Sequence, residues 1–140
     1  MLTNPEGVND LTSALIDAAI TVHKELGPGL LEAVYTECLM HELLDRNFDV
    51  DTNQRLPIVY RGHTLSNHYF LDLRVNQKVI IEVKSIVALA PIHSAQLMTY
   101  LRLSGLHVGL LINFNAPLLK DGLRRIIRPQ RKAEAQEHRP

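Results

Sequence analysis

The sequence predicts an α/β fold in which a mixed central sheet is flanked by helices. Apolar residues recur at helical spacing through the first third of the 140-residue chain. The period changes after residue 56, and over residues 68–75 the side chains alternate between two faces, which is the two-residue period of strands. A nearly continuous apolar run at 107–112 follows a further helical segment and is typical of a strand buried on both faces. The predicted order of elements is α-α-β-β-β-α-β.

Two helices are predicted before the first strand. Asn9 or Asp10 is placed to cap the first helix. Its apolar positions run from Leu11 to Val22, and Gly27-Pro28-Gly29 ends it because two glycines and a proline do not continue a helix cheaply. The second helix is expected over residues 30–46, with an apolar stripe made of Leu31, Val34, Leu39, Leu43 and Leu44.

Short turns then predict an antiparallel meander of three strands. The strands are expected at Leu56–Tyr60, His68–Val75 and Val79–Lys84, with turns at 61–63 and 76–77. A helix follows over 91–104, and further strands are expected at His107–Ile112 and Leu123–Ile127. Residues 1–128 are therefore expected to form one domain, and residues 129–140 a polar, basic and flexible C-terminal tail.

The charges balance, but they are unevenly distributed. Fifteen Lys and Arg residues match fifteen Asp and Glu residues, which argues against a uniformly basic protein that coats nucleic acid. Residues 1–51 hold two basic and ten acidic residues, whereas residues 52–112 hold six basic and two acidic ones. A single cysteine, Cys38, excludes a disulfide within the chain. With no signal peptide and no apolar run of about 18 residues, we expect a cytoplasmic protein that does not enter the membrane.

The segment Ile81-Glu82-Val83-Lys84 carries the most distinctive chemistry. Glu82 and Lys84 are two residues apart on a predicted strand and therefore point to the same side. In a hairpin that turns at 76–77, Asp72 falls near position 81 or 82. Two neighbouring carboxylates repel each other, and a hard divalent cation removes that repulsion. The alternative is a pair of cross-strand ion pairs, Asp72 with Lys84 and Glu82 with Arg74.

Several motifs follow one another in a characteristic order. They are G-x-x-E-x-x-Y at Gly29, Glu32 and Tyr35, then Asp72, then E-x-K at 82–84, then Gln96-Leu97-Met98-Thr99-Tyr100. This ordered set, together with the run 109–114, resembles the PD-(D/E)xK nuclease superfamily, and specifically the GxxExxY proteins. It is also similar to the RecB-type and lambda-exonuclease-type branch. The resemblance covers residues 11–128 and implies a restriction-endonuclease-like core of order α-β-β-β-α-β.

The resemblance implies a divalent metal site, with Mg²⁺ or Mn²⁺ as the ion. Asp72 and Glu82 would be its carboxylate ligands, and the backbone carbonyl of Val83 would be a further oxygen ligand. Glu32 would lie at the edge of the site, bound to the metal directly or through water. These residues would serve phosphodiester hydrolysis, in which the transition state gains negative charge.

The resemblance also implies roles for three further side chains. Lys84 would orient or activate the attacking water and stabilise charge on the phosphate. Gln96 and Tyr100, four residues apart and therefore on one helix face, would line the site or contact the DNA backbone. Two departures stand close to Asp72: Phe70 replaces a basic residue that many relatives have, and Leu71 replaces the proline of the superfamily's name.

Other candidate residues carry two interpretations each. Tyr35 is predicted either to contact substrate or to pack in the core. His93 either faces the site or has a surface role at the start of its helix. Arg124 and Arg125 either contact phosphates or form a solvated basic run with Arg128, Arg131 and Lys132. No Cys or His pair has the spacing of zinc ligands.

The functional hypothesis from the sequence is a metal-dependent nuclease that acts on DNA in preference to RNA. The alternative is a non-catalytic module that keeps the nuclease fold and binds nucleic acid or a protein. A third hypothesis is a subunit that cleaves only within a homo-oligomer, which would build the substrate channel that so short a chain lacks.

Overall fold

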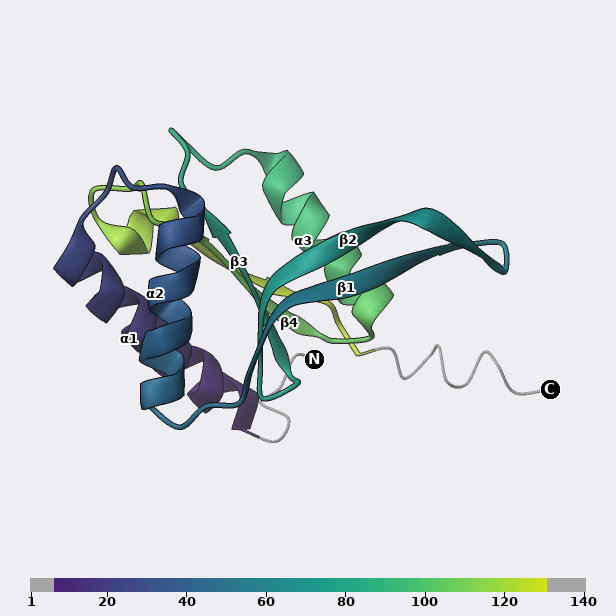
Figure 1. Cartoon of the computed structure of the whole chain (residues 1–140), viewed down its shortest axis with the longest axis horizontal. Coiled ribbons are helices and arrows are strands. Elements are labelled where there is room, and N and C mark those ends of the chain that lie inside the picture. The colour runs from purple at the N-terminus through teal and green to yellow at the C-terminus, as the bar shows by residue number, and fades with distance from the viewer. Residues whose placement is uncertain (1–6, 131–140) are drawn as a thin grey trace.

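The structure, a computed structural model that describes residues 7–130, is organised around a five-stranded sheet with helices on both faces (Figure 1). Its elements are α1 (Val8–Leu26), α2 (Glu32–Asp45), β1 (Val50–Tyr60), β2 (His63–Val75), β3 (Val79–Lys84), α3 (Pro91–Ser104), β4 (Val108–Asn113), the 3₁₀ helix η2 (Leu119–Gly122) and β5 (Leu123–Ile127). The strands lie in the order β1-β2-β3-β4-β5. Among the strands of residues 7–130 only β3 and β4 pair in parallel, and α3 makes the crossover that a parallel pair needs. The predicted mixed α/β, restriction-endonuclease-like fold is confirmed.

Each face of the sheet has its own hydrophobic core. Ile81 and Val83 of β3 belong to the core beneath α1 and α2, where Tyr35 is fully buried and stacks on the ring of Phe114 with centroids 4.7 Å apart. Ile80 points to the opposite face and packs with buried leucines of α3. Strand β3 is therefore covered on both sides, which is why it reads as an almost unbroken apolar segment.

Three elements lie where the sequence predicts them: Val79–Lys84, Pro91–Ser104 and Leu123–Ile127. The first helix begins at Val8, after Gly7 in a left-handed conformation, so Asn9 and Asp10 are not its cap. The predicted apolar stripe of α2 is partly wrong, because its buried residues are Tyr35, Leu39 and Leu43 whereas Leu31, Val34 and Leu44 are exposed.

The first two strands are much longer than predicted. β1 begins at Val50 and not at Leu56, and β2 begins at His63 and not at His68. Their outer parts form a β-hairpin, here called the arm (residues 54–70), that projects beyond the body of the protein (Figure 1). Most side chains of the arm are exposed on both faces, so the apolar and polar alternation that marks a half-buried strand is absent there.

Two further expectations concern the C-terminal tail and the membrane. Most of the predicted C-terminal tail lies outside the described residues, namely residues 131–140, which include Arg131 and Lys132. No helix within residues 7–130 is long and apolar enough to cross a membrane.

Candidate active site

The candidate site lies where β2 and β3 separate. Their backbone ladder ends at the pair Leu73 and Ile81. One position further on, hydrogen bonds that involve side chains replace the backbone hydrogen bonds between the two strands. The Asp72 N–H donates to Glu82 Oε1 over 3.3 Å, and the Val83 N–H donates to Asp72 Oδ2 over 2.9 Å. The chain thus brings the two predicted carboxylates together at the opening between the strands.

Burial dominates the electrostatics of this pair. Glu82 is 7% exposed, and its burial, followed by the neighbouring charge of Asp72, raises its pKa to about 8. Burial likewise raises the pKa of Asp72, while the hydrogen bond from Val83 opposes that shift. Both carboxylates are therefore costly to ionise where they stand, which is the situation that a bound cation relieves.

The alternative of two cross-strand ion pairs is wrong. Arg74 pairs with Asp51 of β1 at 2.8 Å and not with Glu82. Lys84 makes none of the ion pairs found among the described residues. Its charge nonetheless lowers the pKa values of the nearby carboxyl groups, so the ammonium lies within electrostatic reach of the site.

Glu32, the first residue of α2, is brought to the site by the loop that precedes it. The Tyr35 hydroxyl donates to the Gly27 carbonyl over 2.5 Å and accepts from the Leu30 N–H over 3.1 Å. The Ser85 hydroxyl donates to the Leu30 carbonyl over 2.5 Å, which fastens the loop to the end of β3 directly after Lys84. Tyr35 is thus a core residue that shapes the loop, and its predicted contact with substrate is not supported because its side chain is fully buried.

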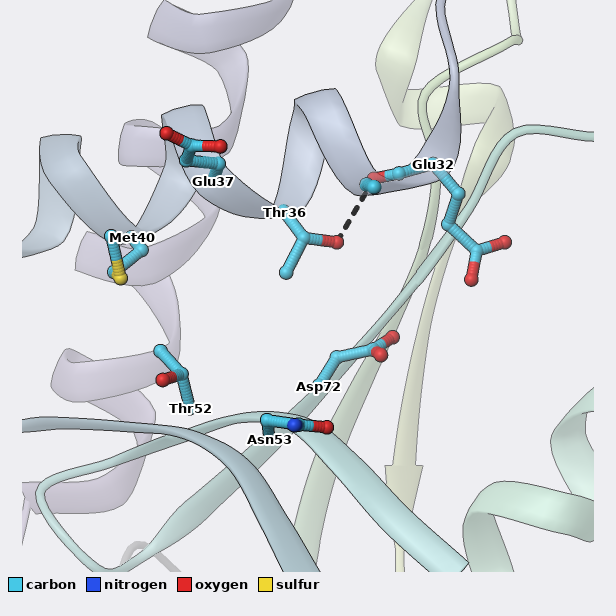
Figure 2. Close-up of a pocket in the computed structure, with 8 residues that line it drawn as sticks. Glu32, Thr36, Glu37, Met40, Thr52, Asn53 and Asp72 are labelled. Atoms are coloured by element: carbon cyan, nitrogen blue, oxygen red, sulfur yellow. Dashed lines mark hydrogen bonds between the residues drawn. The ribbon is translucent and has the colours of Figure 1, made fainter.

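A pocket of ≈ 460 Å³ opens between α2 and the sheet beside these residues (Figure 2). Figure 2 shows the carboxylates of Glu32 and Asp72 facing a common space, with Asn53 of β1 alongside. Burial raises the pKa of Glu32, while Lys84 lowers it and Asp72 raises it. The pKa of Glu32 therefore responds to the charges of both Lys84 and Asp72 across the pocket.

Helix α3 contributes Tyr100 on another side of the site. Burial and then the charge of Glu82 raise the pKa of Tyr100 to about 12, and its ring lies 5.2 Å from that of Tyr69. Gln96 is exposed one turn earlier on the same helix. His93 accepts a hydrogen bond from the Ala90 N–H over 2.8 Å at the start of the helix, and its predicted contact with substrate stays a prediction.

The two arginines of β5 make hydrogen bonds to groups other than the carboxylates of the candidate site. Arg125 donates to the side chain of Asn9 on α1. Arg124 donates to the carbonyls of Asp121 and Leu123 close to it in the chain. The predicted contact of these arginines with substrate stays a prediction.

Sequence reasoning missed three residues that shape the site. Ser85 ties the loop before α2 to β3, and Tyr69 packs on Tyr100. Asn113 is 2% exposed and fixes the chain after β3, because its side chain accepts from the Ile86 N–H and donates to the Ile86 carbonyl. Of these three residues, only Asn113 could have been noticed in the sequence, because it is a polar residue at the end of a buried apolar run.

The donor set fits a hard divalent cation. Asp72 and Glu82 offer adjacent carboxylate oxygens. The carbonyl of Val83 points to the same edge of β3 as its N–H, since both groups of one residue face the same neighbouring strand. Within residues 7–130 no three His, Cys, Asp or Glu side chains are grouped to hold a metal. The set is therefore two carboxylates and a carbonyl, with Glu32 across the pocket.

Of the comparisons with known proteins, the one with family models assigns the chain to a family. No curated protein matches the chain. Among solved structures, the crystal structure of SSO0001 is similar with a TM-score of 0.46 at 19% identity, over 86% of this chain and 68% of that one. That likeness is too distant to support an argument. The sequence model of the PD-(D/E)XK nuclease superfamily matches residues 9–126. The chain belongs to the PD-(D/E)XK nuclease superfamily.

Proposed function

We propose that this protein is a Mg²⁺- or Mn²⁺-dependent nuclease that hydrolyses phosphodiester bonds of DNA in preference to RNA, and that it is one of the GxxExxY proteins. Membership of the superfamily indicates a nuclease-type function, and superfamily members generally use divalent metals. The observation that carries the proposal is the junction of β2 and β3, where Asp72 and Glu82 replace the backbone ladder with two adjacent, buried carboxylates.

In this proposal Asp72, Glu82 and the Val83 carbonyl hold the cation, and Glu32 binds at its edge. A bound Mg²⁺ supplies Lewis-acid stabilisation of the phosphate charge and lowers the pKa of water. The hydrogen bond from Val83 holds the Asp72 carboxylate at the mouth of the opening, so its orientation is set before any ligand arrives. The loop fastened by Ser85 does the same for Glu32.

The remaining residues act on the substrate. Lys84 carries a positive charge within reach of the carboxylates and is not engaged in an ion pair among the described residues, so it is available to a phosphate oxygen and to the attacking water. Gln96 and Tyr100 present one face of α3 to the DNA backbone. The chain's own contribution is therefore positioning and preorganised charge.

The test is cleavage of linear, nicked and single-stranded DNA and of RNA by the purified protein, with Mg²⁺, with Mn²⁺ and with EDTA. We expect metal-dependent cleavage of DNA that is lost in Lys84→Ala. An exposed lysine on α1, Lys24, gives the matched control Lys24→Ala, which should cleave like the wild type. Cleavage no greater than that of Lys84→Ala would favour a non-catalytic module with the same fold.

A further inference from the structure

The arm combines positive charge with exposed aromatic rings. Between Asp51 and Asp72 there is no acidic residue, whereas Arg55 and Arg61 are both present. The arm also exposes aromatic rings, among them that of Phe70, which is 49% exposed. A negatively charged partner with flat apolar faces matches both features.

Strand geometry places part of this surface in line with the candidate site. Leu71 packs in the core beneath α3, so its neighbour Phe70 points to the opposite face. Asp72 lies on that opposite face too, since it lines the pocket beneath α2. On that face Arg55 lies directly across from Phe70 in the β1–β2 register. His68 lies two residues further out, with its ring 5.0 Å from that of Phe70. Arg55, Phe70 and His68, here called the track, thus lead outward along the arm from Asp72.

We propose that the track binds the single-stranded nucleic acid next to the phosphate that is cleaved, with a base stacked on Phe70 and a neighbouring phosphate bound by Arg55. This inference rests on the proposed nuclease function and adds the form of the substrate. Two residues of strand separate Phe70 from Asp72 by about 7 Å, so a base on Phe70 belongs to a nucleotide close to the carboxylates.

The balance of charges and rings favours a single strand over a duplex. Strong duplex binding depends on neutralising many phosphates, and the arm has only Arg55 and Arg61 for this. Unpaired bases, in contrast, expose π-faces that stack on aromatic side chains whatever their sequence. Bases within a duplex already stack on each other and leave the ring of Phe70 without such a partner.

The experiment measures binding without cleavage. Anisotropy of labelled oligothymidylate and of a blunt duplex is recorded in EDTA for the wild type and for variants. We expect Phe70→Leu to weaken binding of the single strand about 5- to 150-fold with an unchanged salt dependence, and Phe70→Tyr to retain binding. Arg55→Ala should reduce the slope of log K against log salt by about 0.7, the value for one phosphate on a single strand.

Lys24→Ala is the matched control, since it removes one exposed positive charge on α1, on the other side of the molecule from the arm (Figure 1). It should change neither affinity nor slope beyond the small effect of net charge. Phe70 and Arg55 are exposed, so circular dichroism and thermal unfolding should be those of the wild type.

The outcomes separate this inference from the nuclease proposal. Equal binding by the wild type and Phe70→Leu, or tighter binding of the duplex than of the single strand, would overturn the track even if metal-dependent cleavage is found. So would a wild-type dimer that Phe70→Leu converts to a monomer with unchanged affinity for DNA, because the ring would then serve self-association. If Lys84→Ala loses cleavage but still binds the single strand, the result supports both the nuclease proposal and the binding role of the track, because the two are then measured separately.

Discussion

Replacing Glu82 with glutamine is expected to stabilise the metal-free protein near neutral pH. Glu82 is 7% exposed, and its pKa is raised from 4.5 to about 8 by burial and then by Asp72. Glutamine keeps the oxygen that accepts the hydrogen bond from the Asp72 N–H but carries no charge at any pH. The substitution therefore removes the cost of burying a carboxylate beside another carboxylate.

The sign follows from proton linkage. The folded state holds the Glu82 proton more tightly than the unfolded state, so stability is fully present below pH 4.5 and is lost as the pH rises toward 8. A pKa difference of this size destabilises the wild type by at most about 3 kcal/mol at pH 7 and by about 1 kcal/mol at pH 5. Glu82→Gln should recover that difference.

Urea unfolding in EDTA at several pH values between 5 and 8 measures the effect. The free energy of unfolding of the wild type should fall by up to about 1.4 kcal/mol per pH unit relative to Glu82→Gln. Glu25→Gln, at an exposed carboxylate of α1, controls for the loss of a negative charge and should run parallel to the wild type. If the curves of Glu82→Gln and the wild type are parallel, Glu82 does not carry a raised pKa and the reasoning fails.

Three further substitutions test the packing, the loop and the chemistry. Gly109→Ala should lower the free energy of unfolding in urea by about 1–3 kcal/mol, because a Cβ there would lie 2.9 Å from the side chain of Leu97; unchanged stability would contradict this close packing. Tyr35→Phe should lower the free energy of unfolding by about 1–3 kcal/mol, because the loop at 27–30 loses its hydroxyl partner, and it should slow cleavage by releasing the adjacent Glu32. Wild-type stability and cleavage rate would show that the loop keeps its conformation without this hydroxyl. Lys84→Met should leave Mn²⁺ binding by calorimetry intact and reduce kcat about 100-fold or more; retained kcat would remove Lys84 from the mechanism.

Much of the fold could be predicted from the sequence, because periodicity reports burial. The limits of β3 and α3 are as predicted: β3 is covered on both faces, and α3 begins at a proline and is followed by a glycine. The prediction failed for residues 50–55 of β1 and 63–67 of β2. These residues are exposed or only partly buried, so they show no clear alternation of apolar and polar side chains.

The candidate site likewise has features that the sequence predicts and features that it does not. The proximity of Asp72 and Glu82 was predictable, because a hairpin with a short turn sets which residues lie opposite each other. The partner of Arg74 was not, since Asp51 lies on a strand whose beginning the sequence did not show. The roles assigned to Lys84 and Gln96 stay predictions.

By itself, the sequence determined the order of the elements, the superfamily and the chemical types of the site residues. Those depend on local spacing and on the order of motifs along the chain. Only the tertiary structure decided that β2 leaves β3 at Asp72, that Ser85 fastens the loop before α2, and that Phe70 and Arg55 continue the face of Asp72 along a projecting arm. Each of these depends on where two segments far apart in sequence stop or start touching, and a backbone hydrogen bond between strands leaves no mark on the identities of the residues that make it.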